Sequence, residues 1–300
     1  MNDKTLSLYV PAVTPFADDL SLDLGRLVAH ARAVLDAGAH GLAPFGSTSE
    51  ANSLTLSERM AGLEALIDGG IGADRIIPGT GCCALGDTIE LTRHASDLGC
   101  KGALMLPPFF YKGVPDEGVY DAYARVIEAV GRNDTRIYLY HIPQMTGVPI
   151  TLPLIDRLLA SFGPVIAGLK DSSGKWENTE AVIRAFPQID VYSASEAMIP
   201  QNAATGGAGC ISASANVNPA GIRRLIDALG TEAEATAHRQ VAAVRKLFES
   251  LPLIPAIKAA VAVQHDDGAF ARVRPPLRQI RPDHDAAIAE AVALAAQASG

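Results

Sequence analysis

Short apolar runs alternate with longer segments of helical period along most of this chain. The short runs have the length of strands, whereas the longer segments between them suit helices. Such alternation predicts parallel strands joined by crossover helices. Helices are expected at residues 57–67 and 116–130, among others. The eight predicted strands are residues 7–13, 41–45, 75–79, 102–106, 136–140, 165–170, 190–193 and 209–212.

Eight strand–helix units without a long polar linker favour one architecture. A closed (β/α)8 TIM barrel uses about 250 residues, which suits this pattern better than an open doubly wound sheet. We therefore predict a barrel over residues 1–230 that carries the active site. Residues 231–300, rich in Ala, Leu, Val, Glu and Arg, are expected to form two or three extra helices packed on the barrel. Such helices often build subunit contacts.

Composition excludes several classes of function. The 300 residues are 48% hydrophobic and carry a net charge of −8 without a basic stripe, which disfavours partners such as nucleic acid or an anionic membrane. No apolar run reaches the roughly 18 residues of a membrane span, and the first 20 residues lack a signal-peptide core. The four cysteines show no CxxC spacing, so neither a disulfide framework nor a zinc site is expected. A cytoplasmic protein is predicted.

Lys170 is the residue that points most directly to chemistry. It ends an apolar predicted strand, and in a barrel of this kind the active site lies at the carboxyl ends of the strands. Burial lowers the pKa of a lysine from about 10.4 toward neutrality, and only the neutral amine attacks a ketone. The position therefore indicates Schiff-base chemistry. The alternative is a solvated or salt-bridged surface lysine beside Asp171.

Tyr140 ends the preceding strand. Neighbouring strands lie about 4.8 Å apart, so its hydroxyl and the Lys170 amine can reach one small molecule. The alternative is a tyrosine that fills a barrel layer with its hydroxyl bonded to a carbonyl. Polar residues also follow other predicted strands, at 46–50 and 195–196.

Seven segments together resemble the family of pyruvate-dependent class I aldolases that holds dihydrodipicolinate synthase and N-acetylneuraminate lyase. The resemblance covers nearly the whole chain. The matching segments are residues 11–16 (PAVTPF), 46–50 (GSTSE), 78–81 (PGTG), 107–111 (PPFFY), 140–143 (YHIP), 168–174 (GLKDSSG) and 254–258 (IPAIK).

The resemblance implies a mechanism. Lys170 would form an imine with the C2 ketone of pyruvate or another 2-oxo acid, and Tyr140 would be the acid and base. Ser47 and Thr48 would hold the pyruvate carboxylate, with Ser47 relaying protons to Tyr140, and the backbone at Ile211 would line the carboxylate. No metal or organic cofactor is implied, and a homotetramer is expected.

The chain departs from the family pattern near the catalytic loop and at a subunit contact. Ser49 replaces the usual glycine, which can restrict the loop dihedrals. The synthases also offer a second tyrosine from a neighbouring subunit, and here either Phe110 or Tyr111 takes that position. If Tyr111 does, the relay between subunits persists, and if Phe110 does, it is absent.

The distal part of the site departs further. Met145 stands where the synthases carry an arginine for the distal carboxylate, and a thioether cannot replace a bidentate guanidinium. N-acetylneuraminate lyases bind the sugar chain with an aspartate followed by a glutamate. Here Ser195 stands in place of the aspartate, and only Glu196 remains. His141 replaces an asparagine and is either a substrate donor or a structural residue. Glu50 is expected to brace its loop.

The function expected is a class I Schiff-base lyase that cleaves or forms a 2-oxo-4-hydroxy acid from pyruvate and an aldehyde. Three alternatives remain open: a 2-oxo-3-deoxy sugar acid dehydratase that uses the same imine, a dihydrodipicolinate synthase, and a non-catalytic 2-oxo acid binding protein. Met145 disfavours the synthase, and a reactive lysine disfavours the binding protein.

Overall fold

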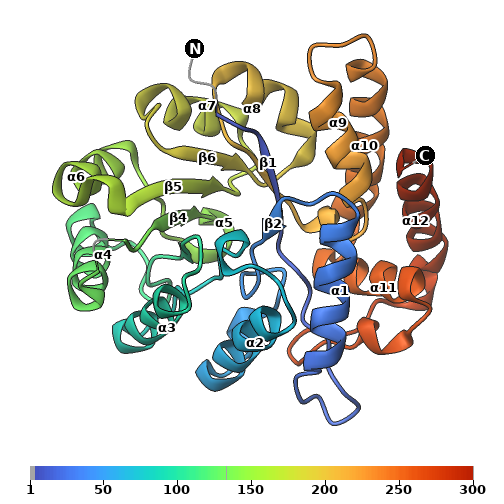
Figure 1. Cartoon of the computed structure of the whole chain (residues 1–300), viewed down its shortest axis with the longest axis horizontal. Coiled ribbons are helices and arrows are strands. Elements are labelled where there is room, and N and C mark those ends of the chain that lie inside the picture. Colours follow the sequence, from blue (N-terminus) through green and yellow to red (C-terminus); the bar gives the residue numbers. More distant parts are fainter. Residues whose placement is uncertain (1–3, 133, 300) are drawn as a thin grey trace.

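A single parallel sheet curls through the centre of the molecule, with helices around it (Figure 1). The structure is a computed structural model that describes residues 4–132 and 134–299. The strand order is β2-β1-β7-β6-β5-β4-β3, and every pairing is parallel. The strands are β1 (Ser7–Val10), β2 (Gly41–Leu42), β3 (Ala103–Met105), β4 (Ile137–His141), β5 (Ile166–Asp171), β6 (Asp190–Ser193) and β7 (Gly209–Ile211).

The predicted strand at residues 75–79 forms no regular ladder, although it closes the barrel. Ile76 makes a single bridge with Leu42, and Gly79 makes one with Leu104. The Ile77 amide donates to the Leu42 carbonyl over 2.9 Å, and the Leu104 amide donates to the Pro78 carbonyl over 2.8 Å. Pro78 has no amide hydrogen, which shortens the ladder here. The other seven predicted strands and the (β/α)8 class are confirmed.

The helices begin and end close to the predicted positions. The helix expected at residues 57–67 starts one residue earlier, because Thr55 and Glu58 form a capping box. The helix expected at 116–130 is confirmed, and Gly131 ends it with a φ of 66°. The α-helices are α1 (Leu24–Asp36), α2 (Leu56–Asp68), α3 (Leu85–Asp97), α4 (Asp116–Val130), α5 (Pro143–Thr146), α6 (Leu152–Phe162), α7 (Trp176–Ala185), α8 (Ile199–Thr205), α9 (Pro219–Ala228), α10 (Glu234–Glu249), α11 (Leu253–His265) and α12 (Asp285–Ser299).

Three tyrosines fill the barrel interior below the strand ends. The rings of Tyr9 and Tyr192 meet edge to face with centroids 5.7 Å apart, and the Tyr138 ring lies 6.2 Å from that of Tyr192. Glycines make room for these rings: a Cβ at Gly168 would lie 2.5 Å from the Tyr138 ring and 2.5 Å from the Asp190 carbonyl oxygen. Large and small residues thus alternate, and the barrel floor is packed.

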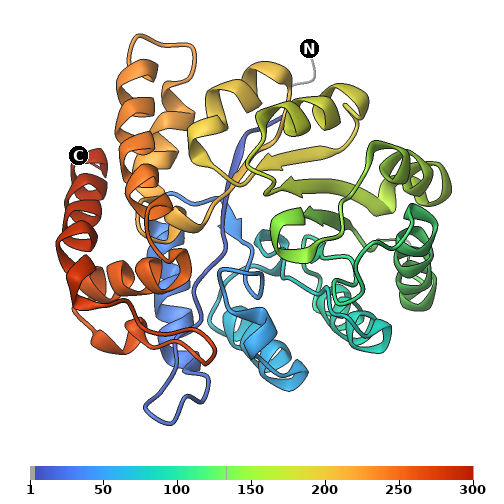
Figure 2. The ribbon, with the colours of Figure 1, turned by 180° about the vertical axis from the view of Figure 1, so that it is seen from behind.

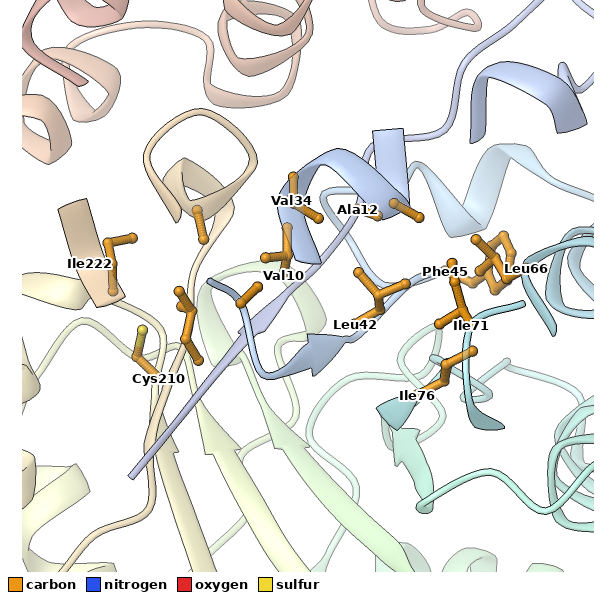
Figure 3. Close-up of a cluster of buried hydrophobic side chains, with 14 of the residues drawn as sticks. Val10, Ala12, Val34, Leu42, Phe45, Leu66, Ile71, Ile76, Cys210 and Ile222 are labelled. Carbon is orange, nitrogen blue, oxygen red and sulfur yellow. The ribbon is translucent and has the colours of Figure 1, made fainter. Parts of the chain in front are cut away.

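A second apolar layer lies between the barrel and its surrounding helices (Figure 3). Val10 and Leu42, on β1 and β2, are fully buried in this layer. They pack in one cluster with Val34 of α1, Leu66 of α2 and Ile222 of α9. This layer holds the surrounding helices against the strands, and so fixes the positions of the strand ends.

The last three α-helices lie outside the ring, beside α9 and α1 (Figures 1 and 2). Phe248 of α10, Ile257 of α11 and Ile288 of α12 form one buried cluster with the barrel residues Val13 and Val217. No single helix among the described residues is long and apolar enough to span a membrane, although α10 and α11, bent by 119°, pass that test as a pair.

The packed floor yields a stability prediction. Gly168→Ala should lower the free energy of unfolding by about 1–3 kcal/mol, because the new methyl group overlaps the Tyr138 ring and the Asp190 carbonyl. Urea denaturation would measure this. Gly86→Ala, in α3, is the matched control, because an added Cβ there meets nothing within 4 Å. Equal losses in both variants would contradict the packing argument.

Candidate active site

A cavity of about 950 Å³ opens over the carboxyl ends of β4, β5 and β7. Its wall combines polar residues from the strand ends with apolar and basic residues from the last seventy residues of the chain. The lining residues are Ser47, Thr48, Tyr140, Ile142, Gln144, Met145, Lys170, Ser172, Ala194, Ile211, Ala213, Arg245, Pro252, Leu253, Ile254, Pro255, Pro276, Leu277, Arg278, Gln279, Ile280, Arg281 and His284.

Lys170 and Tyr140 meet at the base of this cavity. They are register partners on β5 and β4, and both are buried, at 4% and 3% exposure. The Lys170 Nζ donates to the Tyr140 hydroxyl over 3.3 Å and lies 4.4 Å from the centroid of its ring. Among the described residues, no carboxylate forms an ion pair with Lys170. The surface-lysine alternative is therefore wrong.

The Tyr140 phenol is set up to move protons. Burial raises its pKa, but the charge of Lys170 and hydrogen bonds from Ser47, Lys170 and Ser172 outweigh burial and bring the pKa below its ordinary value. The Ser47 hydroxyl lies 3.3 Å from the Tyr140 oxygen. A chain of Ser47, Tyr140 and Lys170 thus links the loop after β2 to the amine.

That loop is held from below by hydrogen bonds. Ser49 is fully buried, and its hydroxyl donates to the Ala12 carbonyl over 2.6 Å, while the Thr14 hydroxyl donates to the Ser49 carbonyl over 2.7 Å. Left-handed backbone occurs on either side, at Phe45 and Glu50, and Ser49 does not share it. Serine in place of the family glycine therefore causes no backbone strain. Thr48, next to it, faces the cavity.

A buried ion pair ties the loop to the last helices. The Lys258 Nζ, on α11, donates to Glu50 Oε1 over 2.6 Å and to the Thr14 carbonyl over 2.8 Å, and both charged side chains are fully buried. Burial lowers the pKa of Lys258 to about 8, against the opposing effect of Glu50. The Arg274 amide donates to the other oxygen of Glu50 over 3.0 Å. Glu50 thus braces the loop, as its position predicts.

Of the other predicted site residues, Met145 and Ile211 line the cavity, and Tyr111 does not. Met145 is 61% exposed, whereas Ile211 is buried at the end of β7. Tyr111 is 74% exposed, and its ring meets that of Phe110 edge to face at 5.3 Å. Both aromatic rings project from the single chain, so either could belong to a contact between subunits.

Glu196 and His141 lie behind the cavity wall. Glu196 is fully buried. The hydroxyls of Ser212 and Ser214 donate to its carboxylate, and Arg245 lies 3.7 Å away. The His141 Nδ1 accepts a hydrogen bond from the Ile150 amide over 2.9 Å, and burial lowers its pKa. These contacts support the structural alternative for His141 and indicate a structural role for Glu196 as well.

Sequence patterns do not predict the basic residues that the C-terminal segment contributes to the cavity. Arg245 comes from α10, and Arg278, Arg281 and His284 come from residues between α11 and the start of α12. No local motif or period marks them, because they reach the cavity only through tertiary packing. Within residues 4–132 and 134–299, no group of three or more His, Cys, Asp or Glu side chains is arranged to hold a metal ion.

Comparison with known proteins identifies the family. The model of the dihydrodipicolinate synthetase family matches residues 4–295. This chain belongs to that family. An uncharacterized DapA-like lyase of Chloroflexus aurantiacus is 41% identical over 85% of each chain, and the 4-hydroxy-tetrahydrodipicolinate synthase of Methanopyrus kandleri is 30% identical over 91% of each.

A solved structure supports the same assignment. Dihydrodipicolinate synthase from Agrobacterium tumefaciens superposes with a TM-score of 0.87 at 29% identity, over 96% of this chain and 98% of the other. As a member of the dihydrodipicolinate synthetase family, the protein is an enzyme of the lyase class.

The buried ion pair yields a second prediction. Glu50→Gln should lower the free energy of unfolding by about 3–5 kcal/mol, because it leaves the Lys258 charge buried without its partner. The double variant Glu50→Gln/Lys258→Met should recover much of that loss in the same urea denaturation experiment. Glu180→Gln, which breaks an exposed pair with Arg184, should change stability by less than about 0.5 kcal/mol. A double variant no more stable than the single one would contradict the argument.

Proposed function

We propose that this protein is a pyruvate-dependent class I lyase that cleaves or forms a 2-oxo-4-hydroxy acid through an imine on Lys170. The observation that supports this most directly is the buried amine within 3.3 Å of the Tyr140 hydroxyl, at the base of a large cavity. A phenol with a lowered pKa beside a lysine supplies the proton transfers that imine formation requires.

The proposed steps use few groups. The Lys170 amine adds to the C2 ketone of pyruvate, and the resulting carbinolamine loses water as Tyr140 supplies a proton. The protonated imine withdraws electrons, so C3 gives up a proton and an enamine forms. The enamine attacks the aldehyde carbon, which restores the imine, and the alkoxide takes a proton to become the 4-hydroxyl. Water then hydrolyses the imine, which releases the 2-oxo-4-hydroxy acid and returns the Lys170 amine. In the reverse direction the C3–C4 bond breaks and the aldehyde leaves.

The loop after β2 suits the carboxylate of the 2-oxo acid. Ser47 and Thr48 both face the cavity, and Ser47 also contacts the Tyr140 hydroxyl. Ile211, at the end of β7, also lines the cavity. We assign the carboxylate to this corner, which places C2 of the substrate between Lys170 and Tyr140.

The dihydrodipicolinate synthase reaction itself is disfavoured in this proposal. Met145 lies on the cavity wall. By the family resemblance it takes the position of an arginine of the synthases, and it supplies no hydrogen-bond donor to a distal carboxylate. Product analysis would separate the lyase from a dehydratase: released pyruvate marks carbon–carbon cleavage, whereas an oxo acid with an unchanged carbon count marks loss of water.

We further propose a cytoplasmic homotetramer. Phe110 and Tyr111 are 72% and 74% exposed on the single chain, and paired exposed aromatics support coverage by a second copy. Sedimentation of the purified protein would test the assembly.

The imine predicts a covalent adduct. Incubation with pyruvate and borohydride should raise the intact mass of the wild type by one reduced pyruvyl group, and Lys170→Ala should lose this adduct because no other amine lies beside Tyr140 in the described site. Lys175→Ala, which removes an exposed lysine of the same segment, should retain it. An unmodified wild type would rule out the imine mechanism.

Tyr140 predicts a kinetic effect. Tyr140→Phe should slow the exchange of the pyruvate C3 protons in deuterated water, followed by NMR, by about 10²–10⁴-fold, because the acid and base of imine formation is lost. Tyr138→Phe is the matched control: its ring fills the same barrel interior, and no hydrogen bond joins it to Lys170 among the described residues. Similar losses in both variants would point to packing instead of proton transfer.

A further inference from the structure

The charged side chains that line the cavity are all basic. Lys170 lies at its base, and Arg245, Arg278 and Arg281 lie on its wall, whereas no aspartate or glutamate of the described residues lines it. This is unusual in a chain whose net charge is −8. A cavity of one sign with low-dielectric walls concentrates ligands of the opposite sign.

The three arginines differ in how far their charges are already compensated. Arg245 is 15% exposed, lies 2.8 Å from Glu249 and 3.7 Å from Glu196, and donates to the Ser212 hydroxyl over 3.2 Å. Arg281 pairs with Asp283. Arg278 is exposed and makes no hydrogen bond or ion pair with any residue in the described ranges.

We propose that Arg278, with Arg245 and Arg281, forms an anion-binding subsite for the distal end of the aldehyde-derived part of the substrate. The proposal rests on the imine at Lys170, which holds the other end. The group bound is a carboxylate or a phosphate, since the guanidinium fork matches both. The substrate class is therefore a 2-oxo-4-hydroxy acid with a second anionic group far from its ketone.

The volume of the cavity suits a substrate longer than pyruvate. Its volume of about 950 Å³ is near the upper end of the range of about 300–1,000 Å³ for small-molecule sites, so pyruvate alone would leave most of it empty. Apolar side chains, including Met145, Leu253 and Ile280, also line the wall. A carbon chain can lie against them while its two ends meet the loop after β2 and the arginines.

This subsite comes from a different part of the chain than Met145 does. Met145 belongs to α5, directly after β4, whereas Arg278 and Arg281 lie between α11 and α12, and Arg245 lies on α10. A distal anion would thus be held by the C-terminal segment and not by the β4–α5 connection.

Trapping of product-like 2-oxo acids tests the subsite without turnover. 2-Oxoadipate ends in a carboxylate and 2-oxoheptanoate ends in a methyl group, and neither has the 4-hydroxyl that cleavage requires. The Lys170 amine and the ketone form an imine and release water, and borohydride supplies the hydride that reduces it to a stable amine. The concentration for half-maximal trapping, read by intact mass, should be at least about tenfold lower for 2-oxoadipate.

Variants assign the preference to the arginines. Arg278→Gln should reduce the ratio between the two acids severalfold, and Arg245→Lys, which keeps a charge beside Glu196, should reduce it as well. Arg239→Gln is the matched control, because it removes the same charge from an exposed position of α10 outside the cavity. Raising the salt concentration should also reduce the ratio in the wild type.

Each outcome separates the subsite from the imine. An adduct with pyruvate but equal trapping of both long acids would overturn the subsite and leave the lyase proposal intact. A preference that survives in both Arg278→Gln and Arg245→Lys would overturn the assignment to these residues. No adduct with any 2-oxo acid would overturn both proposals together.

A separate experiment distinguishes a carboxylate from a phosphate as the group bound. Aldol addition of pyruvate to two charged aldehydes would show which anion the wild type prefers. Succinate semialdehyde is compared with butanal, and glyceraldehyde 3-phosphate is compared with glyceraldehyde. A kcat/KM advantage for one charged aldehyde that falls in Arg278→Gln supports the subsite and identifies its group. Equal kcat/KM values for charged and neutral aldehydes would contradict it.

Discussion

One extra residue in β5 decides where the Lys170 side chain points. Ile137 pairs with Ile166, but the next residue of β4, Tyr138, pairs with Gly168, so Ala167 is left over. Side chains alternate along a strand, and a shift of one residue moves each of them to the other face. Ile166 lies in the outer layer with Ile137, so without the shift Lys170 would point outward too. The bulge brings it into the barrel opposite Tyr140.

The C-terminal segment is as much a part of the site as the barrel is. Lys258 forms the buried ion pair with Glu50, and so anchors the loop that presents Ser47 and Thr48. A buried pair of this kind contributes little net stability after desolvation, but removal of one partner is costly. Its value lies in fixing one loop position. The same segment supplies Arg245 and Arg278 to the cavity wall.

The sequence predicted the features that depend on neighbours along the chain. Strand positions, the place of Lys170 near the end of β5 and the loop at Ser47 follow from local patterns. The ladder expected at residues 75–79 fails because Pro78 lacks an amide hydrogen, and the β5 bulge leaves no compositional trace. Arg278 could not be assigned to the cavity, since only the packing of α11 and α12 brings it there. Long-range packing therefore limited the prediction of the distal site.

In the proposed mechanism, chemistry and specificity come from different parts of this molecule. Lys170 and Tyr140 stand on adjacent strands of a packed barrel, where the register keeps amine and phenol at a fixed separation. Arg245, Arg278 and Arg281, which form the distal wall of the cavity in this proposal, stand on α10 and on the segment between α11 and α12. Those positions lie outside the strands that set the register. A fold built in this way can keep one imine reaction and alter the aldehyde it accepts. Replacement of residues at the distal wall should then change substrate choice while the geometry of Lys170 and Tyr140 is preserved.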